Sequence, residues 1–256
     1  MKTLFVEQFN ELSVFEMCYK TQRPLLLKGP TGCGKTQLVE FMAQKLNRPI
    51  IKVACNEDTN AADLLGRFIL KNGETVWQDG PVTQALRLDA ILYLDELAEA
   101  REDVVVALHP LTDHRREVYL DKIKEVVKAG SDFMLVASYN PGYQHGLKEI
   151  KPSTRQRFVG LTLDYLKFEK EVLVIKEISN IDPKVAIQLV TFANKIRNMK
   201  DLVLKETIST RLLINAAIFI KNGFEIRQAC VVTIAESLTD DKDTLMALKD
   251  LIHIHF

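Results

Sequence analysis

Short apolar runs recur through the N-terminal part of the chain, and several of them have no polar face. Five runs predict buried strands: PLLLK (24–28), PIIKVA (49–54), AILYLD (90–95), FMLVAS (133–138) and FVGLTLD (158–164). Strands of this kind are typical of a sheet that helices cover on both sides. The stretch 35–46 carries apolar residues at helical spacing between the first two runs. This strand–helix–strand alternation predicts an α/β fold with a largely parallel sheet.

Two further stretches predict β-hairpins. In 66–80, Asn72 and Gly73 separate FIL from TVW, and an Asn-Gly pair between apolar runs is a strong hairpin signal. In 115–130, VYL and EVV can form a second antiparallel ribbon. We therefore expect both hairpins in addition to the parallel sheet.

After about residue 165 the strand-like runs give way to helical patterns. Asp182 can cap a helix that has Pro183 at its first position. Ser209 or Thr210 can cap another helix, which Gly223 can stop. Further helices are expected at 225–238 and 242–254. These patterns predict two domains, an α/β core of residues 1–165 and a helical lid of residues 166–256.

Charge and composition narrow the classes of partner. The 256 residues contain 34 Lys plus Arg and 34 Asp plus Glu. Neither side of residue 165 has the net basic excess that would suggest nucleic-acid binding, so no nucleic-acid partner is expected. The N-terminus does not resemble a signal peptide, and no apolar run reaches about 18 residues, so no membrane insertion is expected. Four scattered cysteines favour reduced thiols in the cytoplasm. They are Cys18, Cys33, Cys55 and Cys230.

A glycine-rich motif, GPTGCGKT, follows the first predicted strand and opens the first predicted helix, where a phosphate-binding loop is expected. Its candidate nucleotide-binding residues are Gly29, Pro30, Thr31, Gly32, Cys33, Gly34, Lys35 and Thr36. The backbone N–H groups of such a loop and the N-terminus of the helix attract phosphate. Lys35 would reach the β- and γ-phosphates, and Thr36 would ligate Mg²⁺. The alternative is a chance match at a glycine turn. A redox role is conceivable for Cys33, but a small residue that fits the loop explains it better.

Two acids end the third predicted strand, in ILYLDE (91–96). Asp95 can bind nucleotide-associated Mg²⁺, usually through water. Glu96 can orient and polarise an attacking water as a general base, a group that a small-molecule kinase does not need. The alternative is an acid pair that merely ends a strand at the surface.

Further polar residues follow the same order along the chain. Asn140, after the fourth predicted strand, can position the water or sense the γ-phosphate, although Asn-Pro by itself is a turn signal. Arg157, with Arg155 as the second candidate, can point out of its own subunit and complete a neighbour's site. Arg211 can report loss of the γ-phosphate by moving the helical domain. The alternatives are solvated arginines.

This succession of motifs resembles that of AAA+ ATPases. Over residues 20–220 the chain is similar to the MoxR branch of these ATPases, and within that branch to the CbbQ/NirQ/NorQ group. The stretches that carry this similarity are CNEDTNAADLLGRF, WQDGP, HPLTDHRR, SYNPGYQ and STRQRF. The resemblance implies a three-layer α/β/α core with strand order 5-1-4-3-2 and a helical lid. It also implies that the two hairpins are the helix-2 insert and the pre-sensor-1 hairpin, which face the pore of a ring.

The same resemblance implies a function. Members form homo-hexamers, use ATP and Mg²⁺, and work with a partner protein that carries a von Willebrand factor A domain. They remodel or activate a target metabolic enzyme, either Rubisco or nitric oxide reductase. The alternative is an ATP-dependent assembly switch or scaffold with little turnover. A DNA motor is disfavoured by the even charge balance, and a kinase would leave Glu96, Arg157 and Arg211 unexplained.

Overall fold

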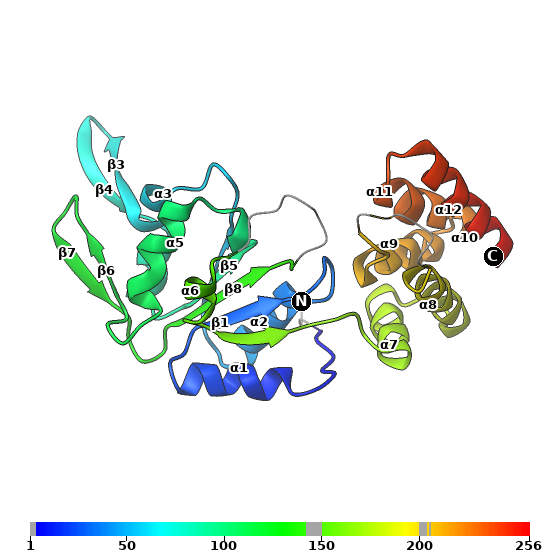
Figure 1. The fold of residues 1–256 in the computed structure, drawn as a ribbon, viewed down its shortest axis with the longest axis horizontal. Coiled ribbons are helices and arrows are strands. Elements are labelled where there is room, and N and C mark those ends of the chain that lie inside the picture. The colour runs from blue at the N-terminus through cyan, green and yellow to red at the C-terminus, as the bar shows by residue number, and fades with distance from the viewer. Residues whose placement is uncertain (1–3, 142–149, 200–203, 205) are drawn as a thin grey trace. The chain divides into compact units, whose positions relative to one another are not determined.

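The computed structural model describes residues 4–141, 150–199, 204 and 206–256 and is drawn in Figure 1. Its described residues form two compact units. The first unit is drawn from residues 1–29 and 34–163 and contains every described strand, and the second is drawn from residues 30–33 and 164–256 and is helical. Residues 142–144, at the end of the SYNPGYQ stretch, lie outside the described residues.

A five-stranded sheet forms the centre of the first unit, and every neighbouring pair in it is parallel. Its strands are β1 (Leu25–Lys28), β2 (Ile50–Ala54), β5 (Ile91–Asp95), β8 (Met134–Tyr139) and β9 (Val159–Thr162). They are ordered β2-β5-β8-β1-β9. If only these five strands are numbered along the chain, the order read from β9 is 5-1-4-3-2. The apolar runs therefore predicted all five strands and the α/β class.

One helix precedes the first strand of this sheet, and the others lie between its strands. They are α1 (Glu11–Lys20), α2 (Lys35–Lys45), α3 (Ala61–Leu65), α4 (Pro81–Arg87), α5 (Glu102–Leu108) and α6 (Pro152–Arg155), with 3-10 turns η1 (Leu97–Glu99) and η2 (His109–Leu111). The helix predicted at 35–46 is α2, and it buries its apolar face. Strands β5 and β8 are almost wholly buried, so their apolar sequences reflect a position at the centre of the core.

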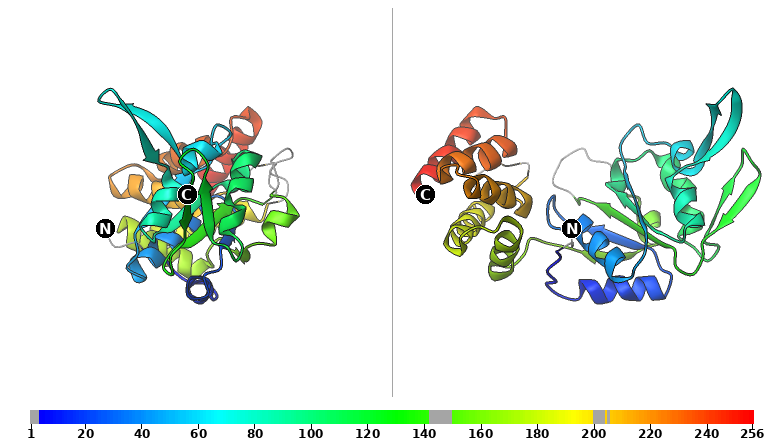
Figure 2. Two further views of the ribbon diagram at one scale, coloured as in Figure 1. Left: turned by 90° about the vertical axis from the view of Figure 1, so that its left-hand side faces the viewer. Right: turned by 180° about the vertical axis from the view of Figure 1, so that it is seen from behind.

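Both predicted hairpins are present. They are β3 (Gly66–Lys71) with β4 (Glu74–Asp79), and β6 (Glu117–Leu120) with β7 (Glu125–Lys128). Asn72 and Gly73 form the first turn with φ of 52° and 84°, the left-handed pair that an Asn-Gly hairpin needs. The hairpins project from the same end of the α/β unit (Figures 1 and 2).

The second unit consists of packed helices. They are α7 (Phe168–Ser179), α8 (Pro183–Arg197), α9 (Thr210–Lys221), α10 (Ile226–Cys230), α11 (Glu236–Leu238) and α12 (Lys242–His255), with a π-helical segment, η3 (Val231–Ala235). Asp182 caps α8 by accepting from the Lys184 N–H, and Ser209 caps α9. The caps were predicted correctly, whereas the π segment interrupts the single helix expected over 225–238.

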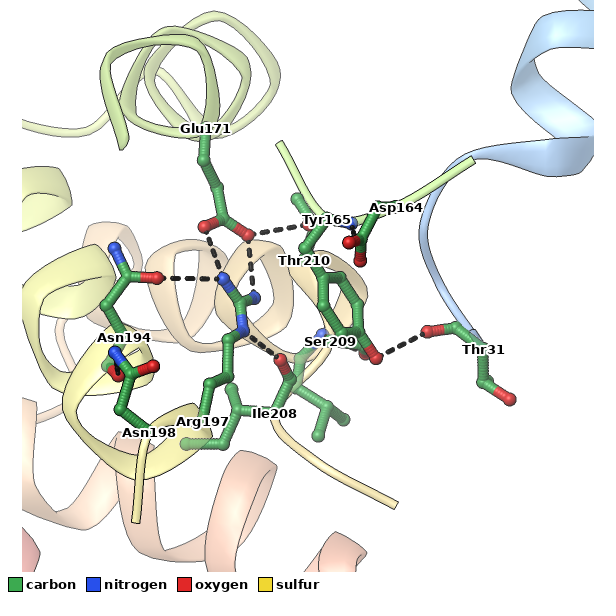
Figure 3. A network of polar contacts seen from close by, with 11 residues as sticks. Thr31, Asp164, Tyr165, Glu171, Asn194, Arg197, Asn198, Ile208, Ser209 and Thr210 are labelled. Carbon is green, nitrogen blue, oxygen red and sulfur yellow. Dashed lines mark hydrogen bonds and ion pairs between the residues drawn. The ribbon is translucent and has the colours of Figure 1, made fainter. Parts of the chain in front are cut away.

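A buried ion pair joins three helices of this unit (Figure 3). The Glu171 carboxylate in α7 is fully buried and accepts from both terminal nitrogens of Arg197 in α8, at 2.7 and 2.8 Å. Arg197 Nε donates to the Ile208 carbonyl at 2.8 Å, and Thr210 Oγ1 donates to Glu171 at 2.6 Å. The Tyr165 ring stacks on the guanidinium, with 4.3 Å between the guanidinium carbon and the ring centre. The pair therefore ties the start of α9 to α7 and α8.

Candidate active site

The glycine-rich loop lies between β1 and α2, as its sequence context predicted. Gly32 and Gly34 have φ of 72° and 99°, in the left-handed region that favours glycine. Gly34 is the N-cap of α2, so the loop leads directly into a helix N-terminus. The first backbone N–H groups of a helix lack partners within it and attract anions. The loop can therefore cradle a phosphate.

Lys35 and Asn140 are brought together at this loop. The Lys35 side chain is buried, and its Nζ donates to the Gly29 carbonyl at 2.8 Å and to Asn140 Oδ1 at 2.6 Å. Asn140 follows β8 directly, whereas Lys35 begins α2. Two candidates that are 105 residues apart in the sequence are thus direct partners.

Thr36 and Asp95 form the candidate magnesium site. Thr36 Oγ1 lies 3.5 Å from Asp95 Oδ2, at the end of β5. Mg²⁺ prefers oxygen ligands and usually keeps several waters, with one or two protein carboxylates. A hydroxyl and a carboxylate oxygen at this separation fit that ion.

Tyr93 and Ser138 were not predicted as site residues, yet both bind the Asp95 carboxylate. The Tyr93 hydroxyl donates to Asp95 Oδ1 at 2.8 Å, and Ser138 Oγ donates to the same oxygen. Burial raises the pKa of the Tyr93 hydroxyl. The signal was present in the sequence, because Tyr93 and Ser138 are the polar members of two apolar runs. A polar atom in a fully buried strand needs a hydrogen-bond partner.

Glu96 has an exposed side chain and an unusual backbone. Its φ is 55°, a left-handed value that is uncommon for a residue other than glycine. The Glu96 backbone N–H donates to Ser138 Oγ at 3.2 Å. Sparsely populated backbone conformations cluster at functional sites, where the surrounding structure maintains them. The carboxylate is accessible to water, as a general base for hydrolysis must be.

The two arginines before β9 lie in and just after α6. Arg155 is the last residue of α6, and Arg157 has a side chain that is 37% exposed. Arg157 Nη1 lies 3.8 Å from Asp113 Oδ2, and the same carboxylate binds Arg115 at 2.7 Å. The hydrogen bond from Arg115 lowers the pKa of Asp113. Arg157 is therefore beside a carboxylate that already has a stronger partner.

The remaining candidate, Arg211, lies in the first turn of α9 in the helical unit and is exposed. Its predicted response to the nucleotide stays a prediction. Among the described residues, no group of three or more His, Cys, Asp or Glu side chains could hold a metal ion.

Two family models together match most of the chain. One describes the AAA domain of the dynein-related subfamily and matches residues 24–158. The other describes the CbbQ/NirQ/NorQ C-terminal region and matches residues 169–255. The chain belongs to the CbbQ/NirQ/NorQ family of AAA ATPases. The resemblance noted in the sequence is confirmed, and with it nucleotide binding and ATPase activity.

Relatives of this family align with almost the whole chain. Protein NorQ of Paracoccus denitrificans is 49% identical over 247 residues, which cover 96% of this chain and 92% of the relative. Denitrification regulatory protein NirQ of Stutzerimonas stutzeri is 47% identical, with 96% and 90% covered. Protein CbbQ of Hydrogenophilus thermoluteolus is 50% identical over 240 residues, with 94% and 90% covered. The three identities are too similar to favour one of these relatives.

Solved structures agree on the fold of this CbbQ/NirQ/NorQ-family chain. A mutant of Thermotoga maritima RuvB has a TM-score of 0.60 at 16% identity, covering 98% of this chain and 72% of that chain. NtrX from Brucella abortus, in complex with ADP, has a TM-score of 0.61 at 16% identity, covering 98% and 61%. At such low identity the likeness supports the AAA fold alone. Within the described ranges, no helix has the length and apolar character that crossing a membrane requires.

Proposed function

We propose that this ATPase hydrolyses ATP at the cluster of Lys35, Thr36, Asp95 and Asn140, and uses the reaction to activate or remodel a target enzyme. The observation that carries the proposal is the convergence of these side chains at the carboxyl ends of β1, β5 and β8. Ligands of open parallel sheets bind at that edge. The surrounding core is proposed to span residues 1–165, and the helical lid residues 166–256.

The chain's own groups divide the work of hydrolysis. Lys35 binds the β- and γ-phosphates, and Thr36 and Asp95 hold Mg²⁺. When bound, Mg²⁺ would supply positive charge to the phosphate oxygens. Glu96 accepts the proton of the water that attacks the γ-phosphorus. Asn140, already bonded to Lys35 Nζ, aligns that water.

Arg157 supplies positive charge to the nucleotide site of an adjacent subunit, with Arg155 as the second candidate. The Arg157 guanidinium is exposed, and its neighbour Asp113 has a closer partner in Arg115. Arg157 can therefore leave Asp113 at a modest cost in free energy, which supports this role. Arg211 couples loss of the γ-phosphate to movement of the lid.

The assembly is a homo-hexameric ring in the cytoplasm that acts with a partner carrying a von Willebrand factor A domain. Each hairpin carries exposed apolar side chains, which support contact with another protein. They are Phe68 and Leu70 on β3, Tyr119 on β6 and Val126 on β7. The similarity to proteins NorQ, NirQ and CbbQ supports a metabolic enzyme as the target. The two candidates are those that the family resemblance implies, nitric oxide reductase and Rubisco.

A mixing experiment tests the shared site. Lys35→Ala removes phosphate binding and keeps the arginine, whereas Arg157→Ala keeps phosphate binding and should lower turnover by about 10³-fold or more. Each variant alone is inactive, but mixed rings contain interfaces with an intact Lys35 and an intact Arg157. We expect the mixture to recover part of the wild-type ATPase rate. Mixed rings that form, as judged by native mass spectrometry, and stay inactive would contradict the role of Arg157 across the interface.

A further inference from the structure

Two buried hydroxyl groups surround one oxygen of the Asp95 carboxylate. Tyr93 is 1% exposed and Ser138 is 0% exposed, so neither hydroxyl bonds to bulk water. Tyr93 and Asp95 are two residues apart on β5, which places both side chains on the same face of the sheet. Ser138 reaches that face from the neighbouring strand β8, one position beyond the Leu94–Ala137 pair.

The protons in this cluster can be assigned by counting donors. Each hydroxyl has one proton to donate. Both protons point to Asp95 Oδ1, from Tyr93 at 2.8 Å and from Ser138. The Ser138 oxygen in turn accepts from the Glu96 N–H at 3.2 Å. The Tyr93 hydroxyl also lies 3.1 Å from Ser138 Oγ and 3.4 Å from Thr36 Oγ1, but Asp95 Oδ1 is its shorter contact and the charged acceptor. Both protons are therefore assigned to Asp95 Oδ1.

This arrangement makes the two oxygens of Asp95 unequal. Oδ1 is bonded to two hydroxyls inside the core, whereas Oδ2 lies on the side of Thr36 Oγ1, 3.5 Å away. The terminal torsion of an aspartate side chain is broad, so a carboxylate without such partners samples a range of orientations. Two donors on one oxygen restrict that torsion and leave the other oxygen for a ligand.

We propose that Ser138 and Tyr93 are positioning residues that fix the Asp95 carboxylate so that Oδ2, on the side of Thr36 Oγ1, stays available to a magnesium ion. Ser138 also positions the backbone of Glu96, so it ties the metal-binding acid to the general base. This inference rests on the proposed function of Asp95 as a magnesium ligand. It adds two buried residues whose hydroxyls bind the Asp95 carboxylate.

The test measures the coupling between Mg²⁺ and ATP in chains that carry Glu96→Gln, which is expected to bind ATP without hydrolysing it. Coupling is the ratio of the ATP dissociation constants in EDTA and in saturating Mg²⁺. We expect Ser138→Ala and Tyr93→Phe each to reduce this ratio by roughly tenfold, since hydrogen bonds to charged groups are strong. The affinity in EDTA should change less than about twofold, because neither hydroxyl binds the nucleotide.

Matched controls separate positioning from general stability. Tyr139→Phe changes a buried tyrosine on the same strand as Ser138, and Ser179→Ala changes a buried serine in α7 whose hydroxyl bonds the Ile175 carbonyl. Both should leave the coupling at its starting value. A purely structural role of Ser138 would lower the melting temperature and leave the coupling unchanged, and that result would overturn the inference. Tyr93→Phe loses a single oxygen atom, so it provides the test if Ser138→Ala does not fold.

Asp95→Asn distinguishes this inference from the function on which it rests. If Asp95→Asn removes the coupling while Ser138→Ala and Tyr93→Phe keep it, only the positioning inference fails. If Asp95→Asn keeps the coupling, the proposed magnesium role fails and the inference fails with it. The predicted result is loss in all three variants, with the largest loss in Asp95→Asn.

Discussion

The buried Glu171–Arg197 pair predicts a large loss of stability when only one partner is removed. Arg197→Met keeps most of the apolar stem but leaves the Glu171 carboxylate, which is 0% exposed, without its two charged hydrogen bonds (Figure 3). Breaking a buried ion pair in this way typically costs about 3–5 kcal/mol of unfolding free energy. Typical domains are stable by about 5–15 kcal/mol, so the helical unit should lose a large part of its stability.

The double variant Glu171→Leu/Arg197→Met should recover much of this loss, because a well-packed apolar pair often equals a buried ion pair in stability. Recovery will be incomplete. The Ile208 carbonyl and the Thr210 hydroxyl also lose a partner, and each unsatisfied group costs roughly 1–3 kcal/mol. The single and double variants together therefore measure the cost of an unpaired charge separately from the loss of neutral hydrogen bonds.

Amide hydrogen exchange in α9 is the appropriate assay, because it reports the opening free energy of the helical unit rather than of the whole chain. Lys195→Met is the matched control, since Lys195 is an exposed cation in the same helix, α8. We expect it to change the free energy by less than about 0.5 kcal/mol. The reasoning would be refuted if Arg197→Met behaved like Lys195→Met, or if the double variant were no more stable than Arg197→Met.

Two further predictions concern buried positions in the α/β unit. Burial raises the pKa of Cys55 to about 12, with smaller contributions from Asp95 and Glu96. Because the thiolate is the reactive form, iodoacetamide at pH 8 should modify Cys55 far more slowly in the folded chain than in the unfolded chain. Mass spectrometry of the digested protein measures the two rates, and equal rates would contradict the burial. In Gly80→Ala the new Cβ would clash with the backbone carbonyl of Leu64, so we expect a loss of about 1–3 kcal/mol in urea unfolding. Gly160→Ala, whose Cβ would lie 3.4 Å from the flexible end of Lys28, should stay near wild type, and similar losses in both variants would contradict the reasoning.

Local sequence signals predicted much of the fold. The Asn72-Gly73 turn and the caps of α8 and α9 are decided by a few adjacent residues, so they could be read directly from the sequence. The buried strands were equally clear, because a central parallel strand is apolar on both faces. Helices α1 and α4 were not predicted. Helix α4 does have a proline, Pro81, at its first position, but its seven residues are too few to show a helical apolar pattern.

The candidate site was only partly predictable, because its contacts join distant strands. The motifs predicted Lys35 and Asn140 separately, but their bond depends on the neighbouring positions of β1 and β8 in the sheet. Tyr93 was counted as one apolar residue among four, and the run ILYLDE does not indicate where its hydroxyl points. The choice between Arg155 and Arg157 stays open, since it depends on the adjacent subunit.

The central claim is that this chain hydrolyses ATP with Glu96 as the general base, and that assembly completes the site. The most direct test is the steady-state ATPase rate against protein concentration for wild type and Glu96→Gln, with ATP binding and oligomer mass measured in parallel. The account predicts that wild-type specific activity rises as the ring forms. It also predicts that Glu96→Gln binds ATP normally and turns over at least about 10²-fold more slowly. Wild-type turnover in Glu96→Gln would contradict the base assignment, and activity independent of assembly would contradict the shared site.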